Sequence, residues 1–303
     1  MGAAPRRAAE EWSYDIGLSK PAEPALQHTG PESRHHHCGF AASFKEARMS
    51  ELVKAEVVDK ILVITINRPE ARNAVNLEAA EQLAAALDRL DNDDALVIGV
   101  LTGAGNTFCS GMDLKAFAAT GQRPYVGDRG FAGICERPPR KPLIAAVEGY
   151  ALAGGCEIVL SCDLVVAASN ATFGVPEVKR GLVPGSGGMV RLPSRIPYHI
   201  AMEAVLTGDM FPAERFHHFG LVNRLTEPGQ ALQGALALAR SIAANGPLAV
   251  QTAKQIIAES RNWRPADMFD LQRPRIAHVF TSADAKEGAT AFAEKRQPVW
   301  TGK

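Results

Sequence analysis

Two glutamates, Glu157 and Glu177, each follow a segment that distorts the backbone, and each lies among apolar residues. Glu157 comes after the Gly154-Gly155 pair and precedes 158–160, which is Ile-Val-Leu, and Glu177 comes directly after Val175-Pro176. Loss of solvation favours the neutral form of a carboxyl group and moves its pKa toward neutral pH. We therefore predict that these two side chains form a general acid and a general base.

Two glycine-containing segments can supply backbone N–H groups beside such a pair. In 108–115 a predicted strand gives way to a turn and a helix, and 149–157 also ends by opening a helix. The first N–H groups of a helix have no intrahelical partner and lie at its positive end. Two such donors that converge on one carbonyl oxygen would form an oxyanion hole. The alternative is that these glycines serve only tight turns and close packing.

Three other patterns are incomplete. The segment Gly103-Ala104-Gly105 begins like a dinucleotide-binding loop, but Phe108 stands where the third glycine is required. Ser186 lies in a glycine-rich run, but Pro184 stands two positions before it, where a nucleophile elbow has glycine. His217-His218 are neighbours in a predicted helix and so point in different directions. We therefore predict neither a Rossmann site, nor a serine hydrolase, nor a metal site at these positions.

Apolar runs that alternate with helical patterns predict an α/β core whose strands are buried on both faces. Asp59-Lys60 separate the first two runs as a hairpin turn, and no strand is predicted after Ala201. The predicted elements are strands at 57–58, 61–66, 97–102, 142–147 and 164–168, a helix at 77–90 that Asn76 caps, and C-terminal helices at 231–244, 248–260, 265–279 and 283–295.

Composition narrows the class of protein. The 303 residues carry 33 basic and 33 acidic side chains, so no global field favours nucleic acid or an anionic membrane. Five scattered cysteines suit a reducing compartment, no apolar run is long enough to span a membrane, and charges interrupt the N-terminal region where a signal peptide is hydrophobic. We therefore expect a cytoplasmic protein with no nucleic-acid or membrane partner.

Residues 1–48 lack periodicity, which predicts a disordered extension. We assign no metal role to His35-His36-His37 within it.

These residues resemble the crotonase superfamily, the enoyl-CoA hydratase and isomerase group, from about Leu52 to Lys303. The resemblance implies a spiral of ββα repeats over 49–230, a helical C-terminal region over 231–303, and trimers that often pair into hexamers. The matching blocks are 67–74, 111–115, 149–163, 173–188, 206–208, 220–222 and 294–296.

The resemblance also implies the roles of individual residues. The oxyanion donors fall on the N–H groups of Met112 and Gly154, and the two hydratase carboxylates fall on Glu157 and Glu177. The implied reaction is reversible syn addition of water across the C2–C3 double bond of a 2-enoyl-CoA, with CoA as the substrate carrier and neither metal nor redox cofactor. Residues implied to contact CoA are Ala71, Arg72, Ala74, Gly111, Asp113, Leu114 and Lys115.

Two departures from the family pattern leave the substrate open. Ala153 replaces a glycine that is common in the family, and Glu148 stands where asparagine is frequent. The alternatives are a carnitinyl-CoA-type dehydratase, an enoyl-CoA isomerase, and a protein that binds acyl-CoA without turnover. Both glutamates are present, which favours hydration or dehydration over isomerases that use a single carboxylate.

Overall fold

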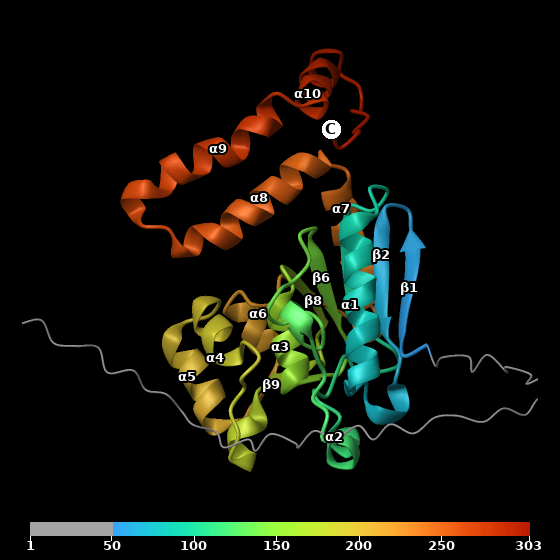
Figure 1. Ribbon diagram of the computed structural model, residues 1–303, viewed down its shortest axis with the longest axis vertical. Helices are drawn as coiled ribbons and strands as arrows, with labels where there is room; N and C mark the ends of the chain where they lie inside the picture. Colours follow the sequence, from blue (N-terminus) through green and yellow to red (C-terminus); the bar gives the residue numbers. More distant parts are fainter. Residues whose placement is uncertain (1–50) are drawn as a thin grey trace, which may run out of the picture. The chain divides into compact units, whose positions relative to one another are not determined.

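The computed structural model describes residues 51–303, and its central element is a six-stranded sheet (Figure 1). The strand order is β1-β2-β3-β6-β8-β11, with β1 antiparallel to β2 and every other pair parallel. The strands of this sheet are β1 (Val53–Val58), β2 (Ile61–Ile66), β3 (Ile98–Gly103), β6 (Leu143–Val147), β8 (Leu164–Ala168) and β11 (Arg224–Thr226).

Both faces of this sheet are covered, as the apolar runs predict. Side chains on neighbouring positions of a strand point to opposite faces, so Leu62 and Ile64 belong to one apolar cluster and Ile61 and Val63 to another. Helix α1 (Leu77–Asn92) packs in the first cluster, and helix α7 (Ala231–Ala243) packs in the second. Parallel strands buried on both sides are typical of a sheet that helices enclose.

Smaller elements build the region around the ends of the central strands. A three-stranded sheet has the order β10-β9-β7, and β4 pairs with β5 in a short antiparallel ribbon. The remaining strands and helices in this region are β4 (Tyr125–Val126), β5 (Gly130–Phe131), β7 (Tyr150–Leu152), β9 (Thr172–Gly174), β10 (Met210–Pro212), α2 (Leu114–Thr120), α3 (Gly154–Ser161), α4 (Gly188–Arg191), α5 (Tyr198–Thr207) and α6 (Ala213–His218). The 3₁₀ turns are η1 (Pro69–Ala71), η2 (Gly127–Arg129), η3 (Pro176–Arg180), η4 (Leu192–Ser194), η5 (Ser260–Asn262) and η6 (Pro265–Asp267).

The prediction that strands end before Ala201 is wrong. β10 pairs with β9, and β11 joins the edge of the large sheet beside β8. Both strands are only three residues long. A run of that length has too few alternations to show a strand period, and its pairing partner decides its conformation.

The C-terminal region is helical, as predicted. After α7 come α8 (Pro247–Glu259), α9 (Met268–Phe280) and α10 (Ala283–Ala293), and Figure 1 shows α8 and α9 side by side. Lys254 ties α8 to the core, because its ammonium group donates to the carbonyls of Pro139 and Lys141 and to the carboxylate of Asp163. Within residues 51–303, no helix has the length and apolar character needed to cross a bilayer.

Glu148, one of the two departures from the family pattern, has a structural role. Its carboxylate accepts hydrogen bonds from the N–H groups of Ala231, at 2.8 Å, and Gly229, at 3.0 Å. These N–H groups lie at the start of α7, where backbone donors lack intrahelical partners and negative charge is favoured. Glu148 therefore fixes the helix that covers one face of the sheet to the loop between β6 and β7.

Candidate active site

Two chain segments that the sequence predicts as N–H donors run alongside each other. Cys109 forms a parallel bridge with Ala151, and the N–H of Leu152 donates to the carbonyl of Cys109 at 3.0 Å. This pairing brings Gly111 to the start of α3: a Cβ built on Gly111 would lie 3.0 Å from the amide nitrogen of Gly154. Gly111 also has a φ of 96°, a conformation that favours glycine. Glycine is therefore required at position 111 both by the backbone conformation and by the close approach to Gly154.

The two predicted oxyanion donors lie at this junction. The N–H groups of Met112 and Gly154 donate to no acceptor among the described residues, whereas the N–H of Asp113 donates to the carbonyl of Val75 at 2.9 Å. Gly154 is the first residue of α3, so its N–H points out of the positive end of a helix. Two free donors on adjoining segments can bind a single oxygen that gains negative charge.

Ala153, the second departure from the family pattern, is the N-cap residue of α3. Its φ of 51° and ψ of −128° lie in a region that residues with a side chain rarely occupy. Strain of this kind costs about 1–3 kcal/mol per residue and is common at functional sites. The same conformation explains why glycine suits this position. The hydrogen bond from the Ala153 N–H to the carbonyl of Gly174, at 2.8 Å, holds the residue in place.

Glu157 lies one turn after Gly154 on α3 and is 3% exposed. Its Oε1 atom accepts hydrogen bonds from the N–H groups of Ser186, at 2.6 Å, and Gly188, at 2.9 Å. Burial raises the pKa of Glu157 above its ordinary value, and these two N–H groups and the nearby Arg191 offset part of that rise. The carboxylate is therefore buried but well supplied with donors.

Glu177 lies in η3, and its surroundings differ from those of Glu157. Its Oε2 atom is buried and has no hydrogen-bond partner among residues 51–303. Burial raises its pKa to about 7, and the charge of Glu157 contributes to the rise. The predicted shift of both carboxyl groups toward neutral pH is therefore present in the structure. The charged form is better stabilised at Glu157, which accepts two N–H hydrogen bonds, than at Glu177.

The cysteines near these carboxylates do not offer a competing nucleophile. Cys109, Cys135 and Cys156 are fully buried, and burial raises the pKa of each thiol to about 12. The thiolate is the reactive form of cysteine. At neutral pH these side chains are neutral packing groups.

The charged residues implied to contact CoA fall into two kinds. Arg72 and Lys115 are exposed, so their positive charges are accessible to an anionic ligand. Asp113 instead caps α2 by accepting from the N–H groups of Lys115 and Ala116, and it pairs with Arg68 at 2.9 Å. Burial alone would raise the pKa of Asp113, but these donors and the guanidinium lower it. Asp113 therefore shapes the turn.

The other residues implied to contact CoA differ in accessibility. Leu114 is 54% exposed, whereas Ala74 is 8% exposed and its carbonyl accepts from Arg68. Gly111 is buried, and its carbonyl accepts from the N–H of Val75 at 2.8 Å. Ala71 is half-buried at the end of η1. Leu114 and Ala71 can present apolar surface to a ligand, whereas Ala74 and Gly111 hold the segments together.

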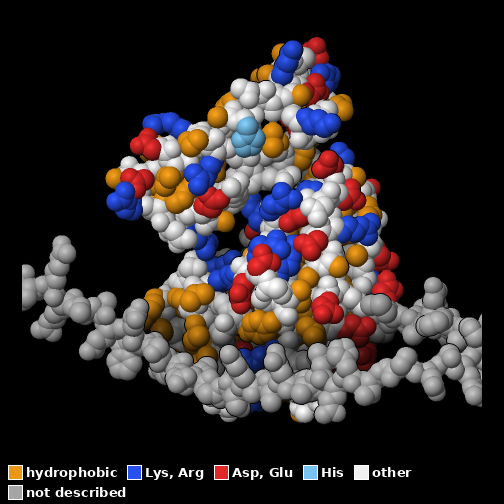
Figure 2. Space-filling view, in the orientation of Figure 1, with side chains coloured by type: hydrophobic (Ala, Val, Ile, Leu, Met, Phe, Trp, Pro, Cys, Tyr) orange, Lys and Arg blue, Asp and Glu red, His pale blue; other side chains and the backbone are white. Residues whose placement is uncertain are grey.

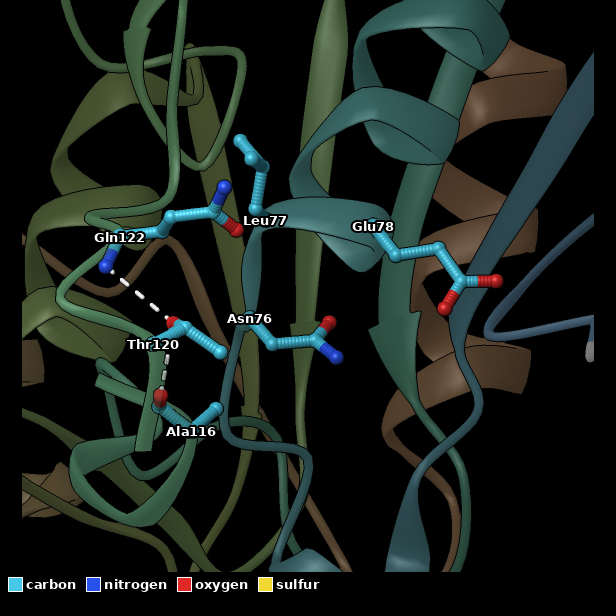
Figure 3. A pocket seen from close by; sticks show the side chains of 6 residues that line it. All are labelled: Asn76, Leu77, Glu78, Ala116, Thr120 and Gln122. Carbon is cyan, nitrogen blue, oxygen red and sulfur yellow. Dashed lines mark hydrogen bonds between the residues drawn. The ribbon is translucent and has the colours of Figure 1, made fainter. Parts of the chain in front are cut away.

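A pocket of about 150 Å³ lies between the start of α1 and helix α2 (Figure 3). The Thr120 hydroxyl accepts from the N–H of Gln122 at 3.2 Å and donates to the carbonyl of Ala116 at 2.9 Å, as the dashed lines in Figure 3 show. The lining residues are Asn76, Leu77, Glu78, Ala116, Thr120 and Gln122. Neither glutamate of the pair lines this pocket. It adjoins both segments implied to bind CoA, because it begins two residues after Ala74 and one residue after Lys115.

Sequence reasoning missed three residues around Glu157. The glycine-rich run at 184–188 contains Ser186 and Gly188, whose N–H groups hold Glu157, and Arg191 follows in α4. The only sequence feature that could have pointed to these residues is the enrichment of glycine near a predicted catalytic carboxylate. It does not reveal a contact between residues about thirty positions apart.

The described part of the chain has no group of three or more His, Cys, Asp or Glu side chains placed to hold a metal ion. The ring of His217 pairs with the carbonyl of Val222 at 2.8 Å, and His218 lies edge-on to Phe219. The prediction for His35-His36-His37 lies outside the described residues, as does the predicted disorder of 1–48.

Comparisons with known proteins identify relatives of this chain. The family model for enoyl-CoA hydratase/isomerase matches residues 56–303. Enoyl-CoA hydratase EchA19 of Mycobacterium tuberculosis is 45% identical over 245 residues, which cover 78% of this chain and 91% of that protein. Carnitinyl-CoA dehydratase of Proteus mirabilis is 38% identical over 266 residues, which cover 84% of this chain and 100% of that protein. The crystal structure of enoyl-CoA hydratase EchA1 from Mycobacterium marinum is 60% identical with a TM-score of 0.82, over 83% of this chain and 99% of that one.

Proposed function

We propose that this chain, which belongs to the enoyl-CoA hydratase/isomerase family, adds water reversibly across the C2–C3 double bond of a 2-enoyl-CoA. The observation that carries the proposal is the carboxyl pair Glu157 and Glu177, whose pKa values burial raises, together with two N–H groups that have no acceptor among the described residues. A carboxylate pair and an oxyanion hole are the groups that this reaction requires.

The surroundings of the two carboxyl groups assign the acid and the base. Glu157 receives two N–H donors and lies near Arg191, so it is the better site for negative charge. Glu177 has a buried oxygen without a donor, so it is the better site for the proton. Two carboxyl groups whose surroundings separate their pKa values commonly divide acid and base roles. Glu157 then takes a proton from the water that attacks C3, and Glu177 delivers a proton to C2.

The thioester supplies the rest of the chemistry. Negative charge develops on its oxygen as water adds, and the N–H groups of Met112 and Gly154 stabilise that charge by about 3 kcal/mol per donor. Because the thioester itself is the electron sink, this reaction needs neither a metal nor a redox cofactor. CoA is the substrate carrier, and Arg72 and Lys115 supply cations for its phosphates.

Loss of the enoyl-thioester ultraviolet absorbance tests the proposal directly. We expect purified protein to bleach crotonyl-CoA or a longer 2-enoyl-CoA, and we expect the double variant Glu157→Gln/Glu177→Gln to leave the absorbance unchanged. Acyl-CoA binding without bleaching by the wild type would contradict the hydratase. Similarity to the whole length of a carnitinyl-CoA dehydratase favours that activity as the second candidate, so carnitinyl-CoA belongs in the same series.

The pH dependence of kcat/KM follows from the carboxyl pair. Hydration needs Glu157 ionised and Glu177 protonated, so we expect a bell-shaped profile that falls about tenfold per pH unit above the Glu177 pKa of about 7. The acid limb, which is the fall of kcat/KM at low pH, reports the protonation of Glu157. Hydration takes up no net proton, so the dehydration profile must have the same two limbs. A rate that keeps rising between pH 7 and 9 would remove Glu177 from the acid role.

The surface supports assembly into trimers or hexamers, which we also propose. Figure 2 shows hydrophobic side chains gathered over α4 and α5, and exposed side chains there include Val190 at 72% and Leu206 at 65%. In the C-terminal helices, Phe269 and Phe280 are also more than half exposed. Large exposed apolar areas commonly mark protein interfaces. Sedimentation velocity at micromolar concentration should give the mass of three or six chains, and a monomer would refute this assembly.

A further inference from the structure

The segment that holds Glu157 is a glycine-rich loop with few anchors of its own. Ser186 and Gly188, which donate to Glu157, are flanked by Gly185 and Gly187, and Gly187 has a φ of 117°. Glycine loses more conformational freedom on ordering than any other residue. The position of these two N–H groups, and hence of the carboxylate, therefore depends on contacts that the loop makes with other elements.

Tyr125 supplies such a contact from the β4 strand. Its hydroxyl lies 3.1 Å from the hydroxyl of Ser186, 61 positions away in the chain. Ser186 in turn holds Glu157 through its backbone, because its N–H donates to Glu157 Oε1 at 2.6 Å. Tyr125 therefore fixes the side chain of the residue whose N–H fixes the carboxylate.

The ring of Tyr125 is fixed by the other half of the site. It packs edge-on to Phe131, with ring centroids 6.0 Å apart and an interplanar angle of 71°. Phe131 is 3% exposed, and its ring lies against Gly154, where a built Cβ would be 2.5 Å from ring carbons. Aromatic pairs in this geometry attract each other beyond the burial of their area. Tyr125 therefore connects the oxyanion donor at Gly154 with the loop that holds Glu157.

We propose that Tyr125 and Ser186 are positioning residues, and that a hydrogen-bond relay from Tyr125 through Ser186 to Glu157 orients the base. The inference rests on the proposed function, in which Glu157 activates the attacking water. The relay holds the 184–188 loop and the Oε1 side of the carboxylate, leaving the other oxygen to take the proton.

Other groups facing Glu157 stay unchanged when the relay is broken. They are Arg191 on α4, Glu177 on η3, and the thiols of Cys135 and Cys156. Tyr125→Phe keeps the ring and its contact with Phe131 and removes only the hydroxyl. Ser186→Ala keeps the N–H that donates to Glu157. An effect of Tyr125→Phe on Glu157 must therefore travel through the Ser186 hydroxyl.

Steady-state kinetics over a range of pH test the relay. We expect each single variant to lower kcat about tenfold or more, because small displacements of a reacting group are costly, and to leave KM within twofold. A displaced Ser186 N–H stabilises the charged carboxylate less, which raises the pKa of Glu157, so the acid limb of the profile should move to higher pH. The double variant should be no slower than Ser186→Ala, because both changes break one chain of hydrogen bonds.

Matched controls separate the relay from loss of any surface hydroxyl. Tyr198→Phe removes an exposed phenol hydroxyl from α5, and Ser241→Ala removes a hydroxyl from an exposed position in α7, so both should match the wild type. The relay would be overturned if the losses of kcat in Tyr125→Phe and Ser186→Ala multiplied in the double variant and the acid limb of the pH profile did not shift. Single variants within twofold of the wild type would do the same.

A titration of Glu157 by carbon-13 NMR keeps the test independent of turnover. Its side-chain carboxyl signal, assigned with Glu157→Gln, should titrate at higher pH in Tyr125→Phe than in the wild type. An unchanged titration would refute the relay, whatever the catalytic rates are. A wild type without hydratase activity would contradict the proposed function, and the titration would still decide whether Tyr125 acts on Glu157.

Discussion

We expect Glu177→Gln to lower kcat for hydration of a 2-enoyl-CoA by about 10²–10⁴-fold, the usual contribution of a general acid or base. The amide has nearly the shape of the protonated carboxyl group but cannot release a proton to C2. KM should change little, because the N–H groups of Met112 and Gly154 and the CoA contacts stay in place. Stopped-flow or steady-state loss of enoyl-thioester absorbance measures the effect.

The same variant should not lose stability, which separates a chemical defect from unfolding. Burial raises the folded-state pKa of Glu177 to about 7, above the ordinary value of 4.5. The folded state therefore holds this proton more tightly than the unfolded state, and stability falls as pH rises from 4.5 to 7. Glutamine avoids that loss. After a discount for partial exposure, we expect the variant to be about 2 kcal/mol more stable than wild type at pH 8 and about equal at pH 4.5.

Glu81→Gln is the matched control for this prediction. Glu81 is an exposed glutamate on α1, so its conversion to an amide should leave both kcat and the thermal midpoint at wild-type values. Thermal unfolding of both variants at pH 4.5 and pH 8 completes the comparison. Full turnover in Glu177→Gln would remove the side chain from the proton-transfer step. A lower midpoint at pH 8 would show that Glu177 is held by donors that the structure does not contain.

The sequence predicts those parts of the fold that depend on local pattern. The apolar runs of β2, β3, β6 and β8 are long enough to show burial on both faces, and Asn76 caps α1 as predicted, at 2.9 Å from the N–H of Ala79. The raised pKa values of Glu157 and Glu177 also follow from local composition, because their apolar neighbours in sequence remain neighbours in the fold. Each prediction uses information within a few residues of the element concerned.

Contacts between distant segments are the part that local pattern does not contain. The Glu148 carboxylate caps a helix that begins 83 positions later, and the Ser186 N–H reaches Glu157 across 29 positions. The strand β11 exists because β8 offers it an open edge. These features depend on how the spiral closes on itself, so a glycine-rich turn or a three-residue strand carries no local sign of them.

Gly154→Ala should lower kcat/KM by about 10²-fold, because it disturbs the proposed oxyanion donor itself. A Cβ at this position would lie 2.5 Å from Cε1 and Cζ of Phe131, closer than real contacts allow. Phe131 is 3% exposed and packs against Tyr125, so its ring has little room to move. The added methyl must therefore shift either the ring or the start of α3, at a cost of about 1–3 kcal/mol in stability.

The double variant Gly154→Ala/Phe131→Leu shows which of the two moves. If the clash with the ring displaces the Gly154 N–H, a smaller side chain at 131 should restore part of kcat/KM and of the thermal midpoint lost in Gly154→Ala. Gly246→Ala is the control, because a methyl there meets only ordinary contacts with Trp300, at 3.7 Å, far from the carboxylate pair in sequence. Wild-type kcat/KM in Gly154→Ala would mean that the thioester oxygen does not depend on this amide. If Gly154→Ala loses activity at an unchanged thermal midpoint and Phe131→Leu does not restore it, the added methyl itself occupies the space of the thioester.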